Sequence, residues 1–368
     1  MKKINKIFRK KTKRIYIRKV PIGNNAVISV QSMTTTKTTE IKKTVKQIMS
    51  LKNAGADIVR ISVPDKKSAE AFKIIRNKTN IPLVADIHFD YRIAIESIKN
   101  GADCIRINPS NIGSIKRIQS ILEYAKDYNV PIRIGINSGS IEKKIIKKYK
   151  YPNAKAMLES AMNCINIFEK MNFQNFKLSV KSSNVLDTIQ CYKLLSCHTD
   201  HPMHLGITES GNLQNGTIKS SIGIGSLLLQ GIGDTIRVSL SENPIEEVKV
   251  GLKILNALEI RKYGVNIISC PTCARKEFDV IKIANSLEKK LSNISEPIDV
   301  AIMGCSVNGP GESKISQVGV SGLKNKSALY INGIRKKKIK NSLILKELKK
   351  NIQKIIEIKN KYRKKNEK

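Results

Sequence analysis

The sequence has few acidic and few aromatic residues, and it has no long apolar segment. Aspartate and glutamate number 30 against 67 lysines and arginines, and aromatic residues make up 5% of the chain. No stretch approaches the roughly 18 consecutive apolar residues of a membrane helix, so we expect no membrane partner. No apolar segment follows the basic start at residues 1–14, so we expect no secretory signal.

The cysteines indicate the compartment. There are seven of them. Without a secretory signal they favour a reducing, cytoplasmic setting, where clustered cysteines bind metal more often than they form disulfides.

The formal net charge of +37 predicts an attraction to nucleic acid or acidic lipid. However, lysine, isoleucine and asparagine are abundant in every part of the chain, which is typical of A+T-rich coding. The chain has no zinc-finger, helix-turn-helix or aromatic-basic RNA motif. We therefore predict no nucleic-acid partner. We expect residues 1–15 to form a solvated basic arm and residues 347–368 an amphipathic helix.

Residues 16–245 alternate between strand-like runs and helix-like segments such as 40–55 and 114–129. The strand-like runs are 26–33, 56–64, 81–89, 102–109, 130–137, 176–183, 201–208 and 234–241. Alternation of this kind implies parallel strands, and eight repeats favour a (β/α)8 TIM barrel, an α/β fold. A doubly wound sheet would give a similar rhythm.

Several of these runs alternate apolar and polar side chains, and cations recur among the polar ones. These cations are Arg60, Arg106, Arg133, Lys177, Lys181 and Arg237. In a barrel the apolar row must face the helices, so the polar row faces the lumen. Buried cations need counter-ions, either carboxylates such as Asp86, Glu209 and Asp234 or an anionic ligand. We interpret the row as a phosphate or diphosphate site at the carboxyl ends of the strands. A half-exposed antiparallel sheet with a solvated polar face is the alternative.

The rhythm changes after residue 245, and residues 246–368 predict a smaller α/β domain. Cys270 and Cys273 follow one strand-like run and Cys305 follows the next, in the spacing C-x2-C-x31-C. We expect both cysteine segments at the carboxyl ends of strands, where ligands gather in open α/β sheets. A Gly-Pro-Gly turn over 309–311 precedes Glu312.

Three nearby thiolates can hold zinc or an iron–sulfur cluster. A structural zinc site usually needs a fourth cysteine or histidine, but the four histidines all lie in the predicted barrel. Glu312 is therefore the plausible fourth ligand. A carboxylate on one iron would be labile, which suits a cluster that binds substrate. Three unrelated cysteines are the alternative.

Nine segments resemble, in the same order, the 4-hydroxy-3-methylbut-2-en-1-yl diphosphate synthase family of the bacterial methylerythritol phosphate (MEP) route to isoprenoids. They are VQSMT, GADIVRISVP, PLVADIHFDYRIA, RINPSNIG, PIRIGINSGS, HLGITESG, GIGDTIRVSL, SCPTCAR and GCSVNGPGE. The resemblance implies a TIM barrel plus a cluster domain in a homodimer, where the cluster of one subunit covers the barrel mouth of the other. It also implies a 4Fe–4S cluster, with ligands Cys270, Cys273, Cys305 and Glu312.

The resemblance further implies the reductive opening of 2-C-methyl-D-erythritol 2,4-cyclodiphosphate, with loss of water and with two electrons from flavodoxin or ferredoxin. Matching positions assign the diphosphate to Arg60, Arg106, Arg133, Asn137 and Lys181. They assign proton delivery to Glu209 and a helping role to Asp86, His88 and Asn108. Without the resemblance, the alternatives are a pterin-binding methyltransferase-like barrel, against which the three cysteines argue, and a basic zinc protein that binds nucleic acid.

Overall fold

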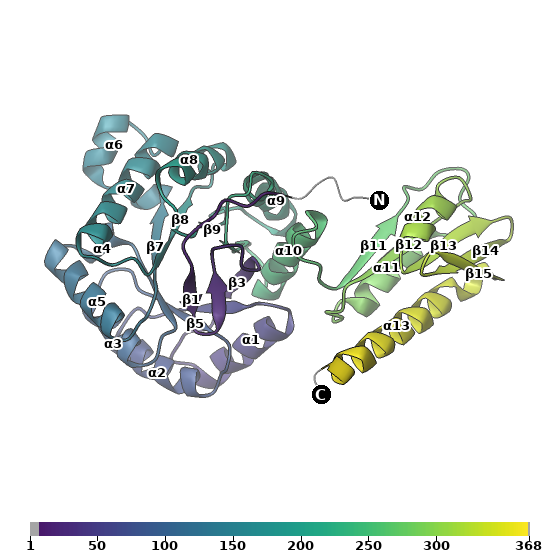
Figure 1. Ribbon diagram of the computed structural model, residues 1–368, viewed down its shortest axis with the longest axis horizontal. Helices are drawn as coiled ribbons and strands as arrows, with labels where there is room; N and C mark the ends of the chain where they lie inside the picture. Colours follow the sequence, from purple (N-terminus) through teal and green to yellow (C-terminus); the bar gives the residue numbers. More distant parts are fainter. Residues whose placement is uncertain (1–6, 367–368) are drawn as a thin grey trace. The chain divides into compact units, whose positions relative to one another are not determined.

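The computed structural model describes residues 7–366, and the chain divides into two compact units between Arg261 and Lys262. Figure 1 shows the first unit as a ring of strands inside helices and the second as a sheet with helices. No described helix is long and apolar enough to cross a membrane.

The described strands of the first unit form a TIM barrel (Figure 1). They are β3 (Ser29–Met33), β4 (Ile58–Ser62), β5 (Leu83–Asp86), β6 (Cys104–Ile107), β7 (Ile132–Asn137), β8 (Phe176–Lys181), β9 (His204–Leu205) and β10 (Thr235–Ile236). The order is β8-β7-β6-β5-β4-β3-β10-β9, every pair is parallel, and a bridge between Leu178 and Met203 closes the ring. All eight predicted runs contain a strand, so the barrel prediction is confirmed and the doubly wound and antiparallel alternatives are wrong.

Helices follow the strands and cover the outside of the barrel (Figure 1). They are α1 (Ile41–Asn53), α2 (Lys66–Asn77), α3 (Tyr91–Lys99), α5 (Ile115–Asp127), α7 (Ala154–Lys170), α8 (Val185–His198), α9 (Leu213–Leu229) and α10 (Pro244–Ala257). The loops at the carboxyl ends of the strands, here called the mouth, also contain α4 (Pro109–Ile112), η1 (Ser138–Ser140) and α6 (Lys143–Tyr149). Asparagine or aspartate side chains cap most of the outer helices at the mouth, as Asp65 does for α2 by accepting from the Ser68 N–H at 2.7 Å.

Helix α10 belongs to the barrel unit, so the first unit continues past the boundary at 245 that the sequence suggests. Its apolar side chains Val248 and Leu255 are buried. A Cβ built at Gly251 would lie 3.2 Å from Val30 of β3, so the glycine lets the helix lie close to the strand. The chain then ends this unit at Arg261, which donates to Asp57 at 3.0 Å. Asp57 immediately precedes β4, so the chain leaves the barrel at the amino ends of the strands, here called the floor.

A hairpin that the sequence reading missed closes the floor. Strands β1 (Ile15–Ile17) and β2 (Val20–Ile22) pair antiparallel, and their isoleucines pack on Ile58, Val84 and Cys104 at the start of three barrel strands. The barrel therefore has one apolar layer at its floor.

The expectation of a solvated amino-terminal arm is wrong over residues 7–14, and residues 1–6 lie outside the described part of the chain. Arg9 donates to Asp234 at 3.0 Å, and the Lys10 and Lys13 backbone N–H groups donate to the carbonyls of Gly231 and Asp200. The segment adheres because its cations and its backbone find acceptors on the barrel.

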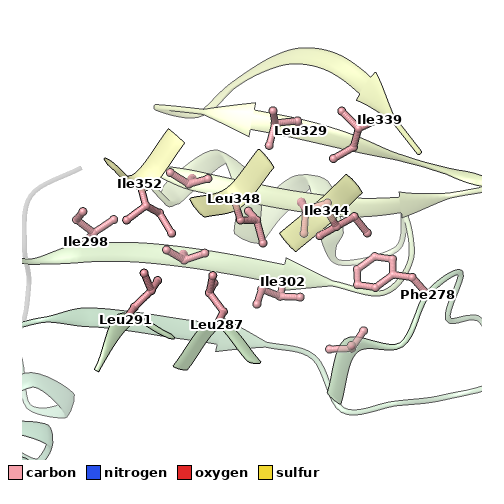
Figure 2. Close-up of a cluster of buried hydrophobic side chains, with 14 residues drawn as sticks. Phe278, Leu287, Leu291, Ile298, Ile302, Leu329, Ile339, Ile344, Leu348 and Ile352 are labelled. Atoms are coloured by element: carbon pink, nitrogen blue, oxygen red, sulfur yellow. The ribbon is translucent and has the colours of Figure 1, made fainter. Parts of the chain in front are cut away.

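The second unit is a five-stranded sheet in the order β11-β12-β13-β14-β15. The strands are β11 (Val265–Ser269), β12 (Ile298–Met303), β13 (Val318–Leu323), β14 (Lys326–Ile331) and β15 (Ile334–Ile339). The first three are parallel, and β14 and β15 add an antiparallel meander. Figure 2 shows Leu287 and Leu291 of α11 (Val280–Leu291) and Leu348 and Ile352 of α13 (Ile344–Asn366) packed with Ile298 and Ile302 of β12. The predicted terminal helix is thus confirmed.

The opposite face of this sheet carries α12 (Gly309–Ile315). A Cβ at Gly309 would meet Ser321, and a Cβ at Gly319 would meet Ser313, whereas Val318 and Val320 belong to the apolar cluster that α11 and α13 cover. The expected Gly-Pro-Gly turn is therefore wrong, because these residues form the first turn of α12. Proline is well suited to that place, since its missing N–H would have no helical partner there.

Candidate active site

The cations of the polar row point into the barrel lumen, as predicted. Arg60, Arg106, Arg133 and Lys181 are all buried. Two glycines on neighbouring strands leave room for them. A Cβ at Gly135 would collide with the Arg106 guanidinium, and a Cβ at Gly206 would collide with the Lys181 ammonium. The long side chains therefore cross the lumen rather than extend outward between the helices.

Asp86, at the end of β5, is the carboxylate at the centre of this cluster. Arg106 donates to it at 3.2 Å, the Arg60 Nε lies 3.6 Å away, and the His88 Nε2 lies 3.5 Å away. Burial acts to raise the pKa of Asp86, but Arg60, His88 and Arg106 outweigh burial and hold the pKa well below its usual range. Asp86 is therefore an ionised anchor for the two arginines at any physiological pH.

Arg133 and Lys181 lack comparable anionic partners. The Arg133 Nε donates to the Ser179 hydroxyl at 3.0 Å, but its buried NH1 has no hydrogen-bond partner among the described residues. Burial lowers the pKa of Arg133 well below its ordinary value, and Arg60 and Arg106 lower it further. Burial also lowers the pKa of Lys181 strongly, with Arg133 and Arg237 adding to the effect. The lumen is thus short of negative charge, as expected for an anion site without its anion.

Arg237, just after β10, joins the cluster although the predicted site set leaves it out. Its NH2 donates to Glu247 of α10 at 3.1 Å. Glu247 is buried and also accepts from the Leu240 N–H at 3.0 Å, so both groups are held in place. The signal for Arg237 was present, because it occupies the same alternating polar row as Arg60 and Arg106.

A second layer of polar groups lies between this cluster and the floor. Lys177 has 0% of its surface exposed, and its Nζ has no hydrogen-bond partner in the described part of the chain. Burial lowers the pKa of Lys177 to about 8. His204 is equally buried, with its Nδ1 2.7 Å from the Thr235 hydroxyl. Lys177 belongs to the predicted polar row but not to the residues assigned to the diphosphate, and His204 belongs to neither set.

The predicted asparagines lie where β6 and β7 open into the mouth. The Asn108 Nδ2 donates to the Ser140 hydroxyl at 3.1 Å, and that hydroxyl donates to the Asn137 carbonyl at 3.1 Å. The structure therefore brings the two residues together through Ser140. Asn108 also caps α4 by accepting from the Ser110 N–H.

Glu209 is exposed at the mouth, two residues after Ile207 of the seventh barrel run. Its backbone φ is +45°, a conformation that residues other than glycine seldom adopt. The Thr208 hydroxyl donates to its Oε1 at 2.9 Å. Strained backbone of this kind is found at functional positions, and the Thr208 hydroxyl holds this exposed carboxylate where the seventh run ends at the mouth.

The cysteines of the second unit lie at the carboxyl edge of its parallel strands, as predicted. Cys270 directly follows β11, Cys305 lies two residues after β12, and the Gly304 N–H donates to the Cys270 sulfur at 3.2 Å. Cys273 is exposed in the loop that follows, and Glu312 lies in the first turn of α12. No three histidine, cysteine, aspartate or glutamate side chains among residues 7–366 converge as metal ligands.

The donor chemistry of this edge nevertheless fits an iron–sulfur cluster. Thiolates are the usual ligands of such clusters, and backbone N–H groups directed at the sulfurs are typical of their surroundings. The Gly304 N–H already occupies that position toward Cys270. The Ser321 hydroxyl donates to the Cys305 carbonyl at 3.1 Å and fixes the second segment.

Comparison with known proteins agrees with both units. The family model described as the GcpE TIM-barrel domain matches residues 12–252, and the GcpE protein C-terminal domain matches residues 266–354. A 4-hydroxy-3-methylbut-2-en-1-yl diphosphate synthase (flavodoxin) from Buchnera aphidicola is 57% identical over 98% of both chains. One from Pectobacterium carotovorum is 54% identical over 90% of this chain and 89% of its own. A crystal structure of the HPPK-DHPS protein of Plasmodium falciparum matches 67% of this chain and 49% of its own, with a TM-score of 0.50 and 12% identity, which shows the barrel fold alone.

Proposed function

The chain belongs to the GcpE family, the 4-hydroxy-3-methylbut-2-en-1-yl diphosphate synthases, and on this premise we propose that its cationic lumen binds the cyclic diphosphate substrate. The enzyme is an oxidoreductase of the MEP pathway. It opens 2-C-methyl-D-erythritol 2,4-cyclodiphosphate reductively, with loss of water, to 4-hydroxy-3-methylbut-2-enyl diphosphate.

The surplus of buried positive charge in the lumen carries the proposal. The polar row has six cationic side chains, whereas Asp86 and Glu247 are the carboxylates that pair with them among the described residues. A dianionic diphosphate would supply the missing negative charge. Arg60, Arg106, Arg133, Lys181 and the Asn137 amide would hold its oxygens, and Arg237 would join them.

Further residues would position groups or transfer a proton. Asp86 orients Arg60 and Arg106 and holds the His88 ring beside them. Asn108 would orient a substrate hydroxyl from the end of β6. The Glu209 carboxyl, held by Thr208, would deliver a proton to the hydroxyl oxygen that leaves as water.

We further propose that Cys270, Cys273, Cys305 and Glu312 hold a 4Fe–4S cluster. When bound, this group would pass the two electrons to the substrate. The contribution of the chain is to fix the thiolates at the edge of the sheet and to stabilise the charge on the Cys270 sulfur through the Gly304 N–H. Such thiolates persist in a reducing compartment, which supports the cytoplasm as the location.

The cluster assignment is tested by Cys305→Ser. We expect the purified variant to lose iron and its brown colour, while the thermal transition of the barrel is unchanged, because the two units have separate cores. The matched control is Cys197→Ser, which removes an exposed thiol on α8. A Cys305→Ser protein with full iron content would overturn the ligand assignment.

The relatives are named for flavodoxin, and we propose flavodoxin rather than ferredoxin as the electron donor. We also propose a homodimer in which the cluster of one subunit serves the mouth of the other. The chain leaves the barrel at its floor, where Arg261 contacts Asp57, and thus at the end opposite its own mouth.

Mixing Glu209→Gln chains with Cys270→Ser chains tests the dimer. A mixed dimer has one intact site and one site with both defects, so free exchange should restore about one quarter of wild-type activity. Each variant alone should be nearly inactive. No recovery in samples shown by mass spectrometry to contain the mixed dimer would mean that each chain uses its own cluster.

A further inference from the structure

Exposed cations surround the cysteine edge of the second unit. Because β11, β12 and β13 are parallel and β15 runs in the same direction, the residues that follow these strands share one edge of the sheet. We call the cations on this edge the basic rim: Arg275, Lys276, Lys324, Lys326, Lys338 and Lys340.

Hydrogen bonds join the segments that carry the rim. The Glu277 N–H donates to the Gly304 carbonyl at 2.9 Å, and the Asn341 Nδ2 donates to the Glu277 carbonyl at 2.7 Å. The loop after Cys273, the segment before Cys305 and the end of β15 are therefore in direct contact. At a strand spacing of about 4.8 Å, the β13–β14 turn lies roughly 5–10 Å from the strand that leads to Cys305.

The charges of the rim are not neutralised within the chain. All six side chains belong to exposed residues, and none forms an ion pair with another described residue. At the opposite edge of the same sheet, Lys262 pairs with Asp299 at 3.8 Å and Lys359 pairs with Glu296 at 3.3 Å. The opposite edge also carries exposed cations without an ion pair to another described residue, Arg335 and Lys336 at the start of β15, so the basic rim is distinguished by its position beside the cysteine segments.

Protection of a free sheet edge explains only part of the rim. Lysines on β15 discourage pairing with another chain, because β15 is the outer strand of the sheet. However, Arg275 and Lys276 lie in the cysteine loop, and Lys324 and Lys326 flank an inner turn. These four residues lie in the cysteine loop and at the turn beside it on the same edge, and they do not guard the outer strand.

We propose that the basic rim is the docking surface for an acidic face of reduced flavodoxin. The inference rests on the proposed function, in which the cysteines hold the electron-accepting group. Two docking events, each delivering one electron, supply the two electrons that one turnover consumes. The rim follows the edge of a five-stranded sheet over roughly 20 Å, a size suited to a small electron-transfer interface.

The test compares two charge reversals of equal size in the same unit. The rim variant is Lys324→Glu/Lys326→Glu. The control is Lys289→Glu/Lys290→Glu, at the end of α11 farthest from the cysteines, where both residues are exposed. The binding of Pectobacterium flavodoxin to each full-length protein is measured by calorimetry at low and moderate salt. Turnover is measured with flavodoxin and, separately, with dithionite, which needs no docking surface.

We expect the rim variant to bind flavodoxin about tenfold more weakly at low salt and to raise the KM for flavodoxin by a similar factor. Added salt should weaken flavodoxin binding by the wild type and so reduce the difference in affinity between the wild type and the rim variant. Turnover with dithionite should be unchanged, and the control should resemble the wild type. Equal loss in both variants, or loss of dithionite turnover in the rim variant alone, would overturn the proposal. If the wild type binds flavodoxin through the rim but shows no turnover with either reductant, the proposed function fails and the docking surface stands.

Discussion

Replacing Lys177 by methionine should stabilise the barrel. The lysine is fully buried on β8, its Nζ has no hydrogen-bond partner among the described residues, and the Cys104 thiol is a neighbour. Burial lowers the pKa of Lys177 from 10.5 to about 8. Methionine has a similar length and flexibility and carries no charge to desolvate, so it should fill the same space.

The size of the effect follows from the two pKa values. Each pKa unit corresponds to about 1.4 kcal/mol, so at pH 7 the buried lysine costs the folded state about 3 kcal/mol. Between pH 8 and pH 10.5 the unfolded chain binds more protons than the folded one, so the wild type regains stability as the pH rises. The advantage of Lys177→Met should therefore fall to about 2 kcal/mol at pH 9.

Urea unfolding at pH 7 and pH 9 measures both values. The chain has no tryptophan, so circular dichroism is the appropriate probe. The control is Lys193→Met on α8, an exposed site where the change should stay within about 0.5 kcal/mol. A Lys177→Met protein that is no more stable than the wild type, or an advantage that does not change with pH, would refute the reasoning, because the ammonium must then have a partner.

Three further outcomes follow from the lumen. Arg133→Leu should weaken substrate binding by about 2 kcal/mol or more, because a charge-assisted hydrogen bond is lost. The effect would appear as a higher KM. An unchanged KM would mean that Arg133 does not contact the substrate. Substrate affinity should fall as the pH rises, because burial lowers the pKa of Lys181 and a neutral amine would no longer attract the dianion. The KM measured across the pH range checks this, and Lys181→Gln should flatten the dependence. Gly206→Ala should reduce kcat/KM at least tenfold, since its Cβ would collide with both the Arg237 backbone carbonyl and the Lys181 ammonium. Wild-type kinetics would show that the lumen can relax.

The barrel could be predicted from the sequence because side chains that alternate between apolar and polar along a strand must point to opposite faces of a closed sheet. One row faces the helices and the other faces the lumen, so Arg60 and Arg106 had to converge once the strands were parallel. The β1–β2 hairpin escaped notice because its three-residue strands are too short to show a pattern and its turn contains Arg18 at φ +57° in place of a glycine.

The β14–β15 hairpin did carry a signal. Asn332 and Gly333 both have positive φ and join two strands, and Asn-Gly between such segments is the strongest short hairpin signature. The lysines around this dipeptide are typical of an exposed surface segment, so the sequence reading predicted no strands there. The expected turn at Gly309 was wrong for a related reason, because glycine and proline were read as turn residues although proline also begins helices.

The barrel balances an apolar floor against a polar interior. Most barrels fill the lumen with branched apolar side chains, whereas here an apolar layer lies at the floor, where Ile58, Val84 and Cys104 pack on the β1–β2 hairpin. Above that floor, the cations repel one another and lie in a site of low polarity, so the folded state is least favourable when no anion is bound. The substrate would then stabilise the folded state in two ways, through its own contacts and by relieving this repulsion.

A ligand present at one hundred times its Kd should raise the unfolding free energy by about 2.7 kcal/mol. Arg133→Leu should show the reverse, with a more stable free protein and a smaller gain from substrate. A variant that is less stable without substrate would mean that the guanidinium packs as a structural group and that the repulsion is already relieved.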